Sequence, residues 1–214
     1  MQVLRAPVVA LVAAFSLIGS AAASTLVVGH RGTGEDKSSN PYPENSIPSI
    51  QAAFEEGADL VEIDVQLAKG GIPVLWHDDK VEVDGEDHYT HELELSQYPV
   101  LRGGDGLTAE VPTFRAALKA ALAAGGPGKV LDIELKIVKK SLRSQLVAAV
   151  AQVLREERAA SRVMFSCFDA DAIVEVEREL PGIESGLLGV WPGKTRKAAE
   201  KLIARGTPVE GVIP

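Results

Sequence analysis

LVEIDVQ, the stretch at residues 60–66, alternates apolar and polar side chains, a pattern that predicts a β-strand. Successive side chains of a strand point to opposite faces, so Glu62, Asp64 and Gln66 share one face and the three apolar side chains between them share the other. The strand is therefore two-faced, with acid on one side and hydrocarbon on the other.

VLDIELK, residues 130–136, repeats the pattern further along the chain. Asp132, Glu134 and Lys136 share one face of this second predicted strand. If both apolar faces pack against helices, both acidic faces point into a barrel or crevice, where unpaired carboxylates need a cation, a lysine or water. An antiparallel sheet with one solvated face is the structural alternative, because alternating charge is ordinary there.

Short apolar runs alternate with segments of helical period along the whole chain. We expect strands at Thr25–His30, Leu60–Gln66, Ile72–His77, Val130–Lys136, Arg162–Cys167, Gly186–Val190 and Val209–Ile213. We expect helices at Asn45–Glu56, Thr113–Ala123, Ser141–Arg158, Ala170–Leu180 and Thr195–Ala204. This order predicts one α/β domain with a parallel sheet, either open and doubly wound or closed into a barrel.

The connection after the first acidic strand is too short for a crossover helix. Its Lys69-Gly70 pair is typical of a turn and predicts a local hairpin. With the turn centred there, Glu62 is expected to lie near His77.

The first 23 residues predict a secretory signal peptide. They contain no acidic residue, one basic residue (Arg5), an apolar stretch from Val8 to Ile18 and small residues up to a cleavage site after Ala23. The alternative is an uncleaved membrane anchor, although the apolar stretch is shorter than the roughly 20 residues that a bilayer requires. We therefore expect residues 24–214 to form one domain that is secreted or periplasmic, with no stable membrane span after cleavage.

The composition and the missing motifs argue against several classes of function. The chain has 214 residues, a formal net charge of −8 and one cysteine, Cys167, so it has no internal disulfide. The charge and the lack of a lysine and arginine cluster argue against a nucleic-acid partner. The sequence also lacks a cysteine cluster for zinc, a G-x-S-x-G elbow and a P-loop.

Two of the four histidines are expected at strand ends. His30 lies in VGHRG (residues 28–32) and His77 in WHDD (residues 76–79), whereas His88 and His91 fall in a polar stretch expected to be a solvated loop. The carboxylates of the acidic faces offer all-oxygen ligands for a hard cation such as Ca²⁺ or Mg²⁺, and Arg31 can bind phosphate. With these groups nearby, the two histidines predict acid/base chemistry at a phosphate ester. The alternative is that both histidines are structural.

Five motifs together resemble the glycerophosphodiester phosphodiesterase family. In chain order they are GHRG (29–32), PENS (43–46), EIDV (62–65), HD (77–78) and ELK (134–136), within a match from about Leu26 to Trp191. The resemblance implies a TIM-type (β/α)8 barrel that hydrolyses glycerophosphodiesters, as small-molecule substrates, to glycerol 3-phosphate and an alcohol. It also implies residue roles: metal ligands Glu62, Asp64 and Glu134; acid/base pair His30 and His77; phosphate contacts Arg31 and Lys136; and site-shaping residues Glu44 and Asn45. For the last two, the start of a helix is an equally simple explanation.

The chain departs from the family pattern in two places. A segment at Glu35–Tyr42 lengthens the loop before Pro43, and only seven strands are expected before Pro214, so the barrel is expected to be incomplete at its C-terminus. Two alternative functions remain open: a phospholipase similar to sphingomyelinase D, and a catalytically silent phosphate-binding module. The polar loop at 78–110 favours a water-soluble substrate over a lipid.

Overall fold

The computed structural model describes residues 26–104, 106–189, 192–204 and 211–213. The predicted signal peptide lies outside these residues, as do Thr25, Val190 and Val209 at the ends of three expected strands. No helix of the described segments combines the length and apolar character needed to cross a bilayer.

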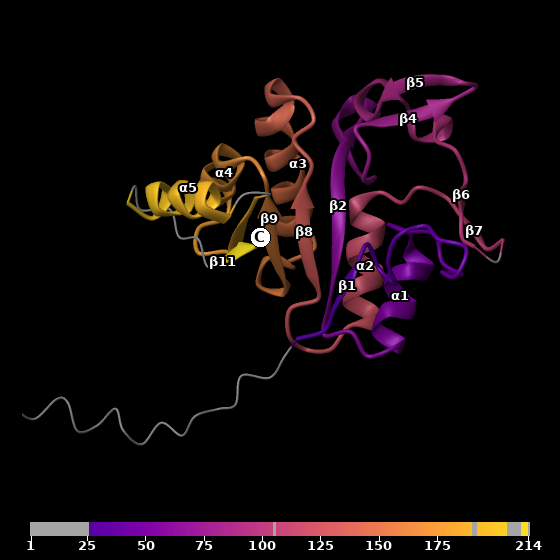
Figure 1. The fold of residues 1–214 in the computed structure, drawn as a ribbon, viewed down its shortest axis with the longest axis horizontal. Helices are drawn as coiled ribbons and strands as arrows, with labels where there is room; N and C mark the ends of the chain where they lie inside the picture. The colour runs from indigo at the N-terminus through magenta and orange to yellow at the C-terminus, as the bar shows by residue number, and fades with distance from the viewer. Residues whose placement is uncertain (1–25, 105, 190–191, 205–210, 214) are drawn as a thin grey trace, which may run out of the picture.

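The described strands of the main sheet follow one another in chain order. Its parallel path runs through β1 (Val28–His30), β2 (Leu60–Ala68), β8 (Leu131–Leu135), β9 (Val163–Cys167), β10 (Ser185–Leu188) and β11 (Gly211–Ile213). Helices connect the strands: α1 (Ile47–Glu55), α2 (Phe114–Ala124), α3 (Arg143–Glu156), α4 (Ala170–Glu179) and α5 (Pro192–Ala204). This winding is that of a βα barrel, and Figure 1 shows the described part as an arc with α1 and α2 on one side and α4 and α5 on the other.

The expected count of seven barrel strands is wrong. β3 (Ile72–Leu75) pairs antiparallel with β2 and leaves the barrel path, so six parallel strands remain among the described residues. The predicted hairpin is confirmed, but its register is shifted by one residue: Val65 pairs with Leu75 and Gln66 with Val74. The turn takes three residues, Lys69–Gly71, because Gly70 and Gly71 adopt φ of 79° and 80°. The hairpin therefore does not place Glu62 opposite His77.

The stretch expected to be a polar loop also contains structure. β4 (Lys80–Val83) and β5 (Glu86–Tyr89) form a hairpin, and β6 (Leu101–Arg102) pairs with β7 (Thr108–Ala109). Asp84 and Gly85 form the first turn with φ of 53° and 82°. An Asp-Gly pair between two short strands is the signal that predicts such a turn.

The apolar faces of β2 and β8 form the middle of the core. Val61, Ile63 and Val65 of β2 are fully buried, and their counterparts on β8 are at most 1 % exposed. Burying a side chain of this size contributes about 1.5–3 kcal/mol relative to its exposure. The two-faced interpretation of these strands is thus confirmed, and the solvated antiparallel alternative is excluded.

Cys167 ends β9 inside this core and is 1 % exposed. Its Sγ donates to the carbonyl oxygen of Leu135 at 3.1 Å and accepts from the backbone N of Asp169 at 3.3 Å. Burial raises the pKa of the thiol to about 12.

Candidate active site

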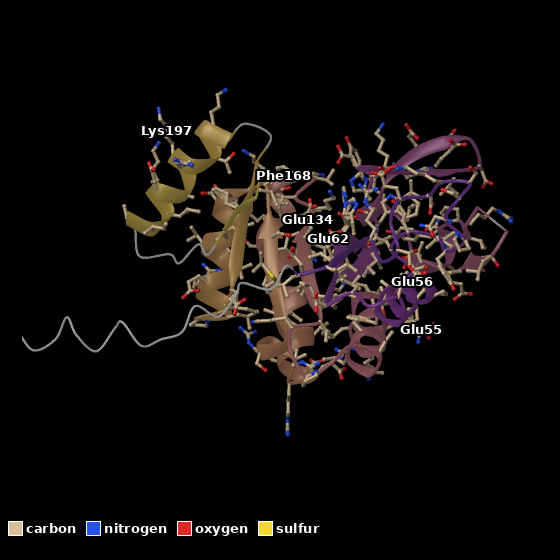
Figure 2. All side chains as sticks on the ribbon, turned by 60° about the horizontal axis from the view of Figure 1, so that its bottom comes forward. Glu55, Glu56, Glu62, Glu134, Phe168 and Lys197 are labelled. Carbon is tan, nitrogen blue, oxygen red and sulfur yellow. The ribbon has the colours of Figure 1, made fainter. Side chains whose placement is uncertain are left out.

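Three carboxylates meet where β2 and β8 lie side by side. Asp64 is paired in register with Glu134, and oxygen atoms of Glu62, Asp64 and Glu134 lie within 4.8 Å of one another. Asp64 is fully buried and the two glutamates are 8 % exposed. Figure 2 shows Glu62 and Glu134 on neighbouring strands of the sheet. The structure thus brings together the three predicted metal ligands.

The electrostatics of this cluster favour a bound cation. Burial, followed by the charge of Asp64, raises the pKa of Glu62, and Glu62 Oε1 has no hydrogen-bond partner. Asp132, opposite Glu62 in register, has its pKa raised to about 6 by burial, although a hydrogen bond from Ser166 opposes the shift. Buried carboxylate oxygens without donors are suited to a hard divalent cation, which prefers oxygen ligands. The acidic triad therefore fits a divalent metal.

Lys136 follows β8 and reaches across to β2. Its Nζ lies 2.8 Å from Glu134 Oε1 and 3.2 Å from Asp64 Oδ1. Burial lowers the pKa of Lys136, but the charges of Asp64 and Glu134 outweigh this effect and the pKa is raised. The ammonium group is therefore held in its charged form at the edge of the triad.

Asn45 fixes the orientation of Asp64. Its Oδ1 accepts from the backbone N of Asp64 at 3.0 Å, and its Nδ2 donates to Asp64 Oδ2 at 2.8 Å. Asn45 reaches this position in the left-handed region, with φ of 53°, while the next residue, Ser46, caps α1 by accepting from the backbone N of Ser49. The PENS motif therefore both shapes the site and starts a helix, on adjacent residues.

Arg31 lies on the other side of Asp64. Its guanidinium contacts both carboxylate oxygens of Glu44, at 3.0 and 3.2 Å, and its Nε lies 3.5 Å from Asp64 Oδ2. Its backbone N donates to Glu62 Oε2 at 3.0 Å. Glu44 in turn accepts from the backbone N of Asp36, so the lengthened loop is connected to the site.

The two predicted catalytic histidines lie at the ends of different strands. His30 ends β1, with its Nε2 3.8 Å from Glu62 Oε2 and 54 % of its side chain exposed. His77 follows β3, with its Nδ1 2.7 Å from Asp78 Oδ1 and 30 % of its side chain exposed. By contrast, His88 lies on β5 opposite Val81, and the ring of His91 stacks on Tyr89.

The sequence matches a family of known proteins. Residues 30–209 match the glycerophosphoryl diester phosphodiesterase family. The chain belongs to this family. It is 30 % identical over 173 residues to a glycerophosphodiester phosphodiesterase of Caldanaerobacter subterraneus subsp. tengcongensis, covering 77 % of this chain and 66 % of that one. It is 46 % identical over 83 residues to the glycerophosphocholine phosphodiesterase GDE1 of Eremothecium gossypii, covering 37 % of this chain but only 6 % of that protein.

Solved structures of the family share the fold. A putative glycerophosphoryl diester phosphodiesterase from Silicibacter pomeroyi DSS-3 matches with a TM-score of 0.68 at 20 % identity, covering 89 % of this chain and 82 % of that one. An Oleispira antarctica phosphodiesterase in complex with sn-glycerol-3-phosphate matches with a TM-score of 0.64 at 23 % identity, covering 89 % and 84 %. The fold is thus that of the family's TIM barrel, of which the described strands form an arc.

Two cavities adjoin predicted site residues. One of about 600 Å³ is lined by Glu134, Lys136 and Phe168 among others, and Phe168 is 56 % exposed; Figure 2 shows Phe168 beyond Glu134. A smaller one of about 100 Å³ lies beside His77 and is lined partly by Asp36 of the lengthened loop. Each cavity therefore gives solvent access to at least one predicted site residue.

The lengthened loop is held against the β6–β7 hairpin by two glycines. A Cβ at Gly103 would overlap the carbonyl oxygen of Pro41, and one at Gly104 would lie 2.5 Å from that of Lys37. The backbone N of Gly104 also donates to the carbonyl of Asn40 at 2.7 Å. Two segments far apart in sequence thus form one wall beside the site.

Sequence reasoning missed the roles of two residues on the acidic faces. Asp132 is buried beside the triad, and Gln66 contacts the backbone around His77. Their positions on the same faces as Glu62 and Glu134 were the available signal.

Proposed function

We propose that the protein hydrolyses glycerophosphodiesters to glycerol 3-phosphate and an alcohol, using Ca²⁺ or Mg²⁺. The observation that carries the proposal is the triad of Glu62, Asp64 and Glu134, with a lysine and an arginine at its edges and His30 against Glu62. This set combines groups that neutralise phosphate charge with groups that transfer protons.

The triad would hold the cation, which supplies charge neutralisation on the phosphate oxygens when bound. Arg31 and Lys136 would bind the same phosphate, since each already lies against Asp64 and can exchange a carboxylate oxygen for a phosphate oxygen. Both side chains are mostly buried, 13 % and 17 % exposed, so their positions are restricted by packing.

Hydrolysis breaks one P–O bond, adds the hydroxyl of water to phosphorus and delivers a proton to the leaving alkoxide. His30 and His77 would share these two proton transfers, one as base and the other as acid. Their positions at the ends of β1 and β3 leave both rings partly open to solvent, as a pair that exchanges protons with substrate and water requires.

The experiment is an assay of glycerol 3-phosphate release. The full chain is incubated with glycerophosphocholine, glycerophosphoethanolamine, glycerophosphoglycerol and, as a lipid comparison, sphingomyelin, with chelator and after addition of Ca²⁺ or Mg²⁺. We expect release from the water-soluble diesters only, lost with chelator and restored by one of the ions. Release of choline from sphingomyelin, with no turnover of the water-soluble diesters, would support the sphingomyelinase D-like alternative. Binding of glycerol 3-phosphate without any turnover would support the silent module.

We also propose that residues 1–23 direct export, so that the mature protein is secreted or periplasmic. The support is the sequence pattern of a short apolar stretch before small residues. Mass spectrometry of the protein recovered from the periplasm or medium of a bacterial host should give a mature chain that begins at Ser24. Recovery of the intact chain from the membrane fraction would instead support an anchor.

A further inference from the structure

Gln66 lies at the end of β2 on the same face as Glu62 and Asp64, yet its side chain is turned toward the chain that follows β3. It is 2 % exposed. Its Nε2 lies 3.0 Å from the carbonyl oxygen of Trp76, 3.3 Å from that of His77 and 2.7 Å from that of Asp78. The two hydrogens of one buried amide are therefore shared among three consecutive carbonyl groups, with that of His77 in the middle.

We call these contacts of Gln66 Nε2 with the carbonyls of residues 76–78 the Gln66 bracket. The bracket begins where the pairing of β2 with β3 ends. β3 pairs with β2 up to Leu75, and the last backbone contact is the donation from Trp76 N to the Asp64 carbonyl at 3.1 Å. Beyond that point the imidazole of His77 has an ion-pair contact with Asp78, whose side chain is 75 % exposed. An exposed partner restrains a side chain weakly, so the hydrogen bonds from the buried Gln66 amide restrain the backbone of His77 more than Asp78 restrains its ring.

The other end of the amide is held by the segment between β3 and α2. Gln66 Oε1 accepts from Thr90 Oγ1 at 3.0 Å, which determines that the nitrogen faces the three carbonyls. The carbonyl of Thr90 accepts from the Tyr98 hydroxyl at 3.0 Å, and the Tyr98 ring meets the Trp76 ring edge-on at 6.0 Å. Thr90 and Tyr98 thus contact, respectively, Gln66 and the chain segment that Gln66 holds.

We propose that Gln66 is a positioning residue that sets the place of His77 relative to the carboxylate triad, with Thr90 orienting its amide. The proposal rests on the proposed function of His77 in proton transfer. A misplacement of about 1 Å at a reacting group can lower turnover about a hundredfold, so the loss of this bracket should be visible in kcat.

The test compares Gln66→Met with Thr90→Val in the full chain. Gln66→Met keeps the length of the side chain and removes its donors, whereas Thr90→Val removes one bond to Gln66 and leaves the donors in place. Both leave a buried polar group without a partner, so both should lower the melting temperature. If Gln66→Met does not fold, Gln66→Asn withdraws the amide by one methylene and serves in its place.

We expect Gln66→Met to lower kcat about ten- to a hundredfold, with metal affinity and inhibition by glycerol 3-phosphate within about threefold of the parent. Thr90→Val should lower kcat by a smaller factor, about two- to threefold, because the amide loses the bond that orients it but keeps its donors. In a His77→Ala background, Gln66→Met should cause no further loss of kcat, because the imidazole that Gln66 positions is already absent. Equal losses of kcat with and without His77 would overturn the proposal.

Hydrogen exchange provides a measure that does not need turnover. The peptide covering residues 75–79 should exchange about tenfold faster in Gln66→Met than in Thr90→Val, since the loss of a hydrogen-bonded bracket makes local opening easier. Unchanged exchange in this peptide would refute the positioning role even in a protein without activity. Faster exchange in a protein that hydrolyses no diester would instead refute only the proposed function.

Discussion

Asp64 shows how single hydrogen bonds decide the geometry of this site. It is fully buried, and its neighbours on three sides are Asn45, Arg31 and Lys136, each from a different part of the chain. Two of these neighbours are cations, but only Asn45 also binds the backbone of Asp64. Asn45 is therefore the residue that fixes the carboxylate rather than merely neutralising it.

The role of Asn45 can be separated from that of the helix start beside it. Asn45→Gly preserves the left-handed backbone and removes both side-chain bonds, and we expect it to cost about 1–3 kcal/mol of stability and to weaken divalent-cation binding. Ser46→Ala removes the cap of α1 at about 1 kcal/mol and should leave cation binding unchanged. Calorimetric titration of both variants checks this, and equal losses of affinity would show that Asn45 acts only through the helix.

The histidines allow a second comparison between single residues. His30→Ala and His77→Ala should each lower turnover by roughly 10²- to 10⁴-fold while glycerol 3-phosphate still binds, because a proton-transfer group is lost and the phosphate contacts remain. His88→Ala and His91→Ala, both in the segment between β3 and α2, should change turnover little. Similar losses for all four, accompanied by lower melting temperatures, would mean that the histidines are structural.

At the scale of elements, β2 and β8 act as one unit with an apolar and an acidic face. Their parallel register places Asp64 against Glu134, so each strand alone carries an incomplete ligand set. Replacing Glu62, Asp64 or Glu134 by Ala should each weaken divalent-ion binding and remove most activity, with the fold retained. Unchanged ion titration in Glu134→Ala would assign that residue to its ion pair with Lys136 instead.

The acidic faces also make stability depend on pH. Since burial and Asp64 raise the pKa of Glu62, the folded chain holds a proton there that the unfolded chain releases above about pH 4.5. The chelated protein should therefore lose stability as the pH rises from 5 to 8, and Glu62→Gln, which cannot titrate, should reduce this loss. A saturating divalent ion should oppose it, because the ion binds the ionised form. Urea unfolding at each pH checks the sign, and a chelated protein that gains stability over this range would contradict it.

The elements that sequence could predict are those with strong periodicity. Each expected helix is present within three residues of its bounds, and the two-faced strands bring together Glu62, Asp64 and Glu134. The predicted register of the β2–β3 hairpin was wrong because two glycines in left-handed conformation lengthen the turn by one residue. The bracket from Gln66 to the peptide groups around His77 could not be predicted, since it depends on where a buried amide points rather than on any pattern.

At the scale of the whole molecule, the described sheet has an edge at β1. β1 pairs with β2 on one side only among the described strands, and Leu26, Val27 and Val28 beside it are 61 %, 57 % and 48 % exposed. An exposed apolar edge strand offers unpaired backbone groups to another chain. This edge is therefore suited to self-association.

We expect the chain to associate increasingly with concentration, and Val28→Lys to reduce this, because a charge on an edge strand opposes pairing. Ile203→Lys is the matched control: Ile203 is 57 % exposed but lies on α5, where no strand edge is available. Light scattering over a range of concentrations measures the effect. Equal effects of the two variants would point to general hydrophobicity, and a monomeric parent would exclude association at this edge.

The rate at which Cys167 is labelled can serve as a measure of how often the sheet opens. It is the one cysteine in the sequence, it lies inside the sheet, and burial keeps its thiol protonated. A thiol-specific dye reacts with the thiolate, so modification must wait until β9 separates from β8. The time course of labelling therefore reports how often the centre of the sheet opens, and it does so in the unmodified protein, with no engineered probe and no competing site.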